Sequence, residues 1–239
     1  MDASRNHPAR GRKKDEGRRT KRRRALSTIF FFLVPSHFFL LLAALTATPH
    51  TDPLPAEIQA PLAAQLRPSG VRAAVNGATL DFWWSAGVPL SGAGSVSWSA
   101  VPEGSLVGAV RISQDFRDIR GRIMKRGVYT LRYGIQPDNG DHLGVSPHRQ
   151  FLLVSPAAED KDPAPLGHEG TVELSKGAVG GSHPAVWSID PPAATQPVLS
   201  IHKTDLDHQA IVVEVPATRD GKAAGALKFG IVLVGKIEA

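Results

Sequence analysis

The sequence predicts an all-β domain, an antiparallel β-sandwich, preceded by an N-terminal signal or anchor helix. From residue 71 onward, apolar or alternating runs of five to ten residues are separated by Gly, Pro, Asn and Asp, which is typical of short strands joined by turns. Residues 25–47 instead form one apolar segment behind an arginine-rich one, which is the order of an export signal. The 23 Gly and 19 Pro residues suit a turn-rich globular domain.

The positive charge of the chain lies in its first segment, a basic n-region over residues 1–24. This segment holds 11 of the 28 Lys and Arg residues and three of the 22 acidic residues. The formal charge of +6 and the pI near 9.8 therefore belong to the n-region, since the remaining 17 basic and 19 acidic residues sum to −2. A body so close to neutrality argues against a nucleic-acid partner, which would need a basic surface.

Residues 25–47 are expected to be a signal peptide or a membrane anchor. Pro35, Ser36 and His37 interrupt the apolar run and small residues follow it, which favours cleavage, with Ala47 as the expected last residue removed. The alternative is an uncleaved anchor, because the run approaches the roughly 20 residues that span a bilayer. Either way we expect export to the periplasm or the extracellular space, with residues 25–47 as the only membrane contact, at the inner membrane if they are retained.

The folded domain is predicted over residues 70–239, behind a Pro-rich linker at residues 48–69. Pro61 limits this linker to at most one short helix, near Ala56–Leu66. No repeat and no alternation of strands with helices interrupts the pattern that follows. Strands are predicted at residues 71–75, 78–85, 95–101, 105–112, 127–136, 150–155, 170–175, 184–189, 197–202, 209–215 and 226–235.

Two of these runs indicate how their strands are covered. In residues 127–136 the apolar side chains, including Tyr129 and Leu131, share one face, and Arg132 lies on the other, which predicts a half-buried strand. In residues 226–235 both faces become apolar toward the end of the run. That pattern predicts a central strand that is covered on both sides.

The stretch "MKRGVYTLRY" is a basic, polar turn that ends in Gly and continues as a Y-x-L-x-Y strand. It resembles the "pGxYtLr" strand motif of secreted bacterial β-sandwich families of unknown function. Residues 116–157 carry most of the likeness, and "SHPAVWSI" and "LKFGIVLVGK" are similar to the same families. The resemblance implies export and a β-sandwich fold, and it implies no activity.

The polar loop after this strand holds candidate ligands for a divalent metal. His142 and His148 lie there with Asp141, and His183 follows a double glycine farther along the chain. Imidazole and carboxylate groups suit a divalent metal, so we name His142, His148, His183 and Asp141 as its candidate ligands if the two loops share one end of the sandwich. The alternative is a plain connection, in which a "PDNG" turn binds its own backbone. The histidine spacing matches no established metal motif.

Two further sets of side chains have both a structural and a functional interpretation. His202 and His208 flank a predicted hairpin turn at residues 204–207, where they could share a metal or be solvated. Trp83 and Trp84 must point to opposite faces of their strand. One is therefore expected in the core, and the other could be a platform for a glycan.

The absent motifs limit the possible chemistry. The chain has no Cys, which excludes disulfides, cysteine-ligated zinc and a thiol nucleophile. It has no G-x-S-x-G elbow, P-loop or dinucleotide fingerprint. The sequence therefore predicts an exported, non-catalytic binding or structural module of the cell envelope, whose ligand is an envelope protein or a glycan. The alternative is a metal-binding protein or a metal-dependent enzyme that uses the His/Asp loop.

Overall fold

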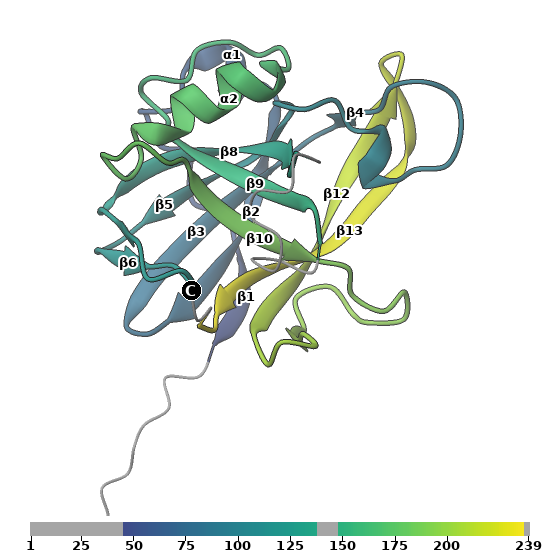
Figure 1. The fold of residues 1–239 in the computed structure, drawn as a ribbon. Helices are drawn as coiled ribbons and strands as arrows, with labels where there is room; N and C mark the ends of the chain where they lie inside the picture. Colours follow the sequence, from purple (N-terminus) through teal and green to yellow (C-terminus); the bar gives the residue numbers. More distant parts are fainter. Residues whose placement is uncertain (1–44, 138–147, 237–239) are drawn as a thin grey trace, which may run out of the picture. The chain divides into compact units, whose positions relative to one another are not determined.

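Figure 1 shows the fold of the chain in this computed structural model, which describes residues 45–137 and 148–236. These residues belong to one compact unit, residues 41–239. The helices are α1 (Ala60–Ala63) and α2 (Gly167–Lys176). The strands are β1 (Thr46–His50), β2 (Leu66–Val75), β3 (Ala78–Ser85), β4 (Val88–Pro89), β5 (Leu106–Ile112), β6 (Phe116–Arg117), β7 (Ile123–Met124), β8 (Gly127–Ile135), β9 (Gln150–Pro156), β10 (Ala185–Asp190), β11 (Ile201–Lys203), β12 (Gln209–Arg219) and β13 (Lys222–Val234).

One continuous sheet contains all of these strands except β6 and β7. Its order is β1-β2-β3-β5-β8-β9-β10-β13-β12-β11, with antiparallel neighbours throughout this path. The short strand β4 directly follows β3 and pairs in parallel with β12, so the sheet curls and brings β12 to the end of β3. The all-β prediction is confirmed. The two packed sheets of a sandwich are not confirmed, because the strands form a single sheet.

Two hairpins of the sheet turn through a residue pair with positive φ angles. Asn76 and Gly77 join β2 to β3 with φ angles of 49° and 80°, and Asp220 and Gly221 join β12 to β13 with 51° and 72°. Asn-Gly and Asp-Gly are the pairs that adopt this left-handed conformation at least cost, and the resulting turn matches the twist of the strands. These dipeptides therefore fix the register of two of the longest pairings.

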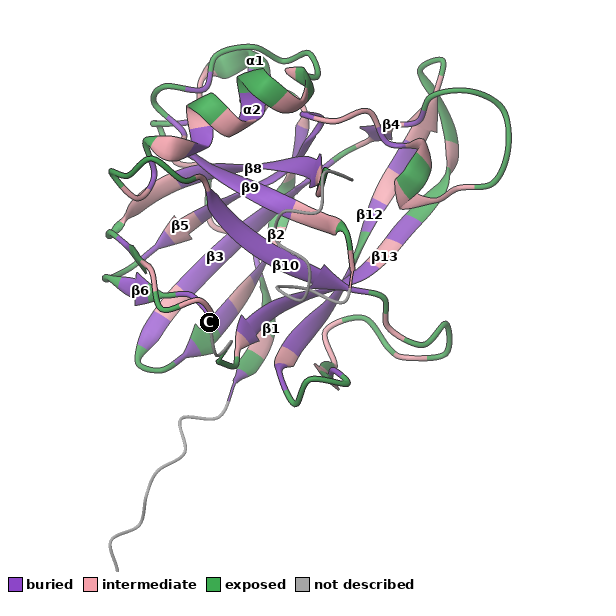
Figure 2. Cartoon of the chain, in the orientation of Figure 1, coloured by how far each residue is buried: buried purple, intermediate pink, exposed green. Residues whose placement is uncertain are grey.

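The interior of the curled sheet is filled by aromatic rings. Trp84 on β3 contacts Phe229 on β13 at 5.5 Å between ring centroids, and Phe82 contacts Trp187 on β10 at 5.7 Å. Strands far apart in the sheet order therefore meet across a packed core, and Figure 2 shows β3 and β10 buried along most of their length. Further ring contacts extend this chain to Phe116, Trp98 and Tyr133.

Adjacent tryptophans occupy opposite faces of β3, as predicted. Trp84 lies in the aromatic interior, whereas Trp83 lies in a second cluster with Ile58 and Leu62, under the segment that holds α1. The exposed fraction is 0% for Trp83 and 1% for Trp84 and Trp187. Burial of these rings argues against the predicted glycan platform.

Residues 170–175 are predicted as a strand but form most of α2. Thr171 and Ser175 are four residues apart, so both lie on one helical face, and both are buried. The Ser175 hydroxyl donates to the carbonyl of Val154 and accepts from the backbone N–H of Ala185, which ties the helix to β9 and β10. Tertiary hydrogen bonds therefore override the strand-like run of residues.

The predicted linker at residues 48–69 contributes to the fold instead. β1 begins at Thr46 and pairs with β2, and Leu45 before it is buried in the core. Pro49 is tolerated because β1 is an edge strand, and the predicted short helix forms as α1 with Pro61 in its first turn. Within residues 45–137 and 148–236, no helix has the length and apolar content to cross a membrane.

Candidate functional site at Asp190

The arginine of the "YTLRY" motif is buried and saturated with hydrogen bonds. Arg132 lies on β8, and its guanidinium makes a two-point contact with the carboxylate of Asp160 at 2.8 and 2.7 Å. Its other N–H groups donate to the carbonyls of Gly104, Ala164 and Asp162. All five guanidinium donors are thus used. The prediction that this strand is half-buried is therefore wrong. The contact with Asp160 allows Arg132 to be buried on the face opposite Tyr129 and Leu131.

Four charged residues form an ion-pair network across β2, β3 and β5. Asp81 accepts from Arg72 at 2.5 Å and from Arg111 at 2.7 Å, and both arginines also contact Asp52. Burial alone would raise the pKa of Asp81, but the hydrogen bonds from the two arginines outweigh it and hold that pKa below its ordinary value. These charges satisfy one another, so we assign the network to the stability of the sheet.

A different cluster brings two histidines to one carboxylate. Asp190 ends β10, and its Oδ1 lies 2.8 Å from Nε2 of His202 on β11, while its Oδ2 lies 3.2 Å from Nε2 of His148. The exposed fraction of the side chain rises from 11% at Asp190 through 16% at His202 to 35% at His148. The carboxylate and His202 are therefore largely buried, and the cluster is exposed to solvent at His148.

Gly230 on β13 provides the space for His202. It pairs with Asp190, and a Cβ atom placed on it would lie 3.3 Å from the Asp190 carbonyl and 3.5 Å from the His202 ring. That Cβ would also be only 3.0 Å from the Cβ of Ala210. A larger side chain at position 230 would therefore displace the imidazole from the carboxylate, because protein interiors have no spare room.

The predicted metal ligands lie partly outside the residues that the structure describes. Asp141 and His142 lie outside the described residues. His183 is exposed in the segment before β10, and His148 contacts Asp190. In the part of the chain that the structure describes, no three His, Asp or Glu side chains are arranged to hold a metal ion.

The histidines on either side of the predicted turn have separate roles. His202 contacts Asp190, whereas His208 is buried with its Nε2 3.3 Å from the carbonyl of Lys236. Thr204 holds the turn, because its hydroxyl accepts from the backbone N–H of His208 at 3.2 Å. The two imidazoles therefore do not share a site, and the turn itself forms as predicted.

Sequence reasoning missed Asp190 and its contact with His202. Asp190 ends an otherwise apolar strand, "AVWSID", and a carboxylate on a strand that is buried throughout needs a partner. That signal could have identified Asp190, but nothing in the spacing identifies which histidine meets it. Comparison with family models, with curated proteins and with solved structures finds no match to this chain. The function must therefore be argued from the geometry.

Proposed function

We propose that this chain is an exported, non-catalytic binding module of the cell envelope, and that its ligand contacts the Asp190 cluster. The cluster presents imidazole and carboxylate groups at one partly exposed position, which is a suitable surface for a polar glycan or peptide. The resemblance of the β8 region to secreted β-sandwich families supports the same interpretation, as does the order of basic, apolar and small residues before Leu45.

The engagement of both imidazoles with Asp190 is the observation that carries this proposal. Each ring uses its Nε2 atom for the carboxylate, at 2.8 Å for His202 and 3.2 Å for His148. Contact with one carboxylate fixes the orientation of both rings, which suits hydrogen bonding of a ligand at a defined position.

Glycan binding by wild-type and variant protein tests the proposal. Soluble fragments of envelope glycans are titrated into the protein by calorimetry, with His202→Gln as the test variant and His168→Gln as its control. His168 is a comparably partnered histidine, 3.4 Å from Glu103, but it lies outside the cluster. We expect saturable binding that the His202 variant loses and the His168 variant keeps. Conversion of any fragment to product, or equal binding by both variants, would contradict the proposal.

Export is tested separately on the full chain. We expect the protein in the envelope fraction, and mass spectrometry of its N-terminus distinguishes a removed signal peptide from a retained anchor. Replacement of Arg22, Arg23 and Arg24 by serine is expected to reduce export, because these charges hold the N-terminal side in the cytoplasm. Wild-type protein confined to the cytoplasm would contradict export and would leave the glycan measurement unaffected.

Divalent metal binding is the second candidate function. Its supporting observation is that His148, a predicted ligand, lies beside the carboxylate of Asp190, which gives two ligands of a site that the described side chains alone do not complete. Elemental analysis after incubation with zinc, copper, iron or manganese tests it, with His148→Ala compared with His168→Ala. About one equivalent of metal that only the His148 variant loses would establish a metal site. An absence of bound metal would exclude this candidate.

A further inference from the structure

A basic ribbon, defined as residues 115–126, connects β5 to β8 and contains β6 and β7. It carries five Lys or Arg residues and two Asp residues, a net charge of +3. The rest of residues 48–239 holds 12 basic and 17 acidic residues, a net charge of −5. The ribbon is therefore a concentrated positive feature on a body of the opposite sign.

The two strands of the ribbon have one buried and one exposed face. Phe116 pairs with Met124, and both side chains are buried in the main core. Arg117 pairs with Ile123, and both side chains are exposed, Ile123 by 42%. The buried pair anchors the ribbon, so the outward face presents an isoleucine among cationic residues. Large apolar residues with this degree of exposure are few in the described chain.

The turn of the ribbon is held in place before any partner binds. The Asp118 carboxylate accepts from the backbone N–H groups of Arg120 at 2.9 Å and Arg122 at 2.8 Å. The Arg122 guanidinium donates to the carbonyl of Pro184 at 2.8 Å, and Ile119 packs against β12 and β13. A surface that is already ordered loses little conformational entropy on binding.

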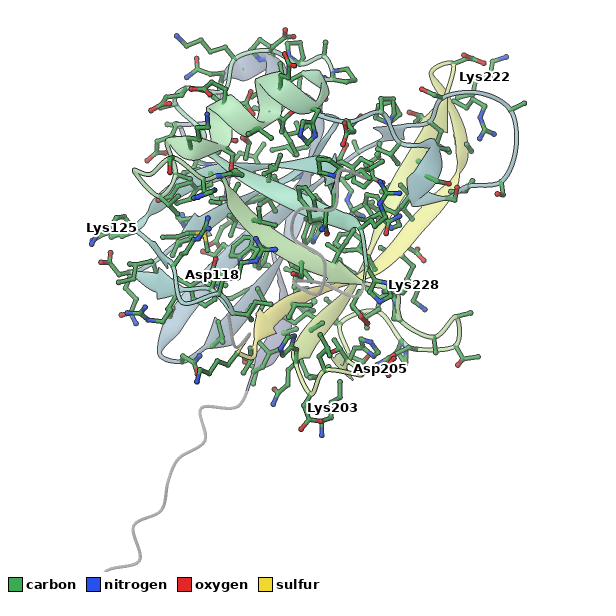
Figure 3. All side chains as sticks on the ribbon, in the orientation of Figure 1. Asp118, Lys125, Lys203, Asp205, Lys222 and Lys228 are labelled. Atoms are coloured by element: carbon green, nitrogen blue, oxygen red, sulfur yellow. The ribbon has the colours of Figure 1, made fainter. Side chains whose placement is uncertain are left out.

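Several cationic groups of the ribbon remain available to solvent. The Arg117 guanidinium donates to the carbonyl of Gly121, a neutral group that leaves its charge uncompensated. Lys125 pairs with Asp115 at 2.7 Å, but its side chain is 73% exposed. Figure 3 shows Lys125 at the margin of the molecule, and Arg126 beside it in the sequence is also exposed.

We propose that the basic ribbon docks on an anionic phospholipid surface, with Ile123 in contact with the lipid. Charge complementarity supports an anionic partner, and an apolar residue framed by Lys and Arg is the composition of interfacial membrane contacts. A purely polar polyanion would gain nothing from Ile123. Each exposed cation near such a surface is expected to change the apparent dissociation constant roughly fivefold. The proposal rests on the proposed function only for the identity of the membrane that the protein meets.

The absence of cysteine from the chain allows a direct test on the full-length protein. Ile123→Cys is labelled with an environment-sensitive fluorophore. Lys222→Cys is the control, since Figure 3 shows Lys222 on the opposite side of the view from Lys125 of the ribbon. The labelled proteins are reconstituted with vesicles of phosphatidylcholine alone or mixed with phosphatidylglycerol. Each label is exposed to iodide in water and to a quencher dissolved in the lipid.

We expect the label at position 123 to be protected from iodide and quenched from the lipid only in the vesicles with phosphatidylglycerol. Salt should reverse this protection, and Lys125→Ser with Arg126→Ser should reduce it, while the control label stays accessible to iodide throughout. Equal accessibility of position 123 in both vesicle types would overturn the proposal. Equal protection by soluble dextran sulfate would also overturn it, because the partner would then be a polyanion. The result does not depend on export or on glycan binding.

Discussion

Single buried carboxylates in this protein are stabilised in two different ways. Asp160 meets the guanidinium of Arg132, whereas Asp118 has only backbone N–H groups as direct donors. Burial raises the pKa of Asp118 above its ordinary value, although these two hydrogen bonds act in the other direction. The charge on Asp118 therefore lowers the stability of the folded state at neutral pH. Its role in the turn depends on the carboxylate oxygen that accepts the two backbone hydrogen bonds.

Asp118→Asn is expected to keep the turn and to be at least as stable as the wild type at pH 7. The amide retains the accepting oxygen and removes the charge, so its advantage should vanish as the pH falls and wild-type Asp118 becomes protonated. Asp118→Ala removes the acceptor and should lower the free energy of unfolding by about 1–3 kcal/mol. Urea unfolding at pH 7 and pH 4 measures both variants. A less stable Asn variant at pH 7 would contradict this role.

Asp160→Ala is expected to lower the free energy of unfolding by about 3–5 kcal/mol, because it leaves the Arg132 charge buried without its carboxylate. Arg132→Met with Asp160→Leu removes both charges, and we expect it to recover much of that loss. Thermal or chemical unfolding of the single and double variants measures the difference. A single variant as stable as the wild type would show that the ion pair is not structural.

The strands of this sheet are predictable from sequence where local apolar content and flanking turn residues determine the structure. The runs that become β3, β5, β8 and β13 are recognisable from their apolar content and flanking turns, and β13 lies between β10 and β12 as a central strand should. Long-range contacts decide the other elements. Residues 170–175 become helical because Ser175 bonds to β9 and β10, and no local pattern shows that contact.

The candidate site was partly predictable for the same reason. His148 was identifiable as a polar loop residue, but Asp190 and His202 meet only because β10 and β11 both lie near β13 and β12 in the curled sheet. Twelve residues separate Asp190 from His202, with no motif in their spacing. The burial of Arg132 was not predictable from its own strand either, because it depends on Asp160, 28 residues away.

The edge strand β1 leads to a prediction about where the folded domain begins. Leu45 is 6% exposed, and Thr46 and Ala47 pair with Ala74 and Ala73 of β2. A chain of residues 48–239 loses this apolar side chain and part of the ladder. Compared with residues 45–239, we expect a loss of about 2–4 kcal/mol in the free energy of unfolding, estimated from burial of one leucine and lost strand pairing. Equal melting temperatures would contradict the structural role of Leu45.

The ion-pair network on β2, β3 and β5 predicts a specific acid response. Because the folded-state pKa of Asp81 lies below its unfolded value, its contribution is fully present above the unfolded pKa of about 4. That contribution is lost as the pH falls through the lower folded-state pKa. Asp81→Asn should therefore be less stable than the wild type at pH 7 and should approach it in strong acid. A gap that is independent of pH, in unfolding measured from pH 7 to pH 2, would contradict this assignment.

At the scale of the whole domain, the curl of the sheet places the Asp190 cluster. The pairing of β4 with β12 brings the β3 side of the sheet to the β12 side, and β10 pairs with β13 through only Ile189 and Asp190. The cluster therefore lies at this two-pair ladder, and His202 joins it from the edge strand β11. Side chains at such a position are held by the sheet but remain accessible, which suits a binding surface.

The histidine side-chain resonances of the protein provide the most direct test of the binding account. The chain has nine histidines, so each can be assigned by substitution and followed by NMR while envelope glycan fragments are added. We expect the signals of His148 and His202 to shift together and saturate, the signal of His168 to stay unchanged, and Asp190→Asn to abolish the response. Saturable glycan binding that leaves the signals of His148 and His202 unchanged would show that the ligand binds elsewhere and would contradict the central claim.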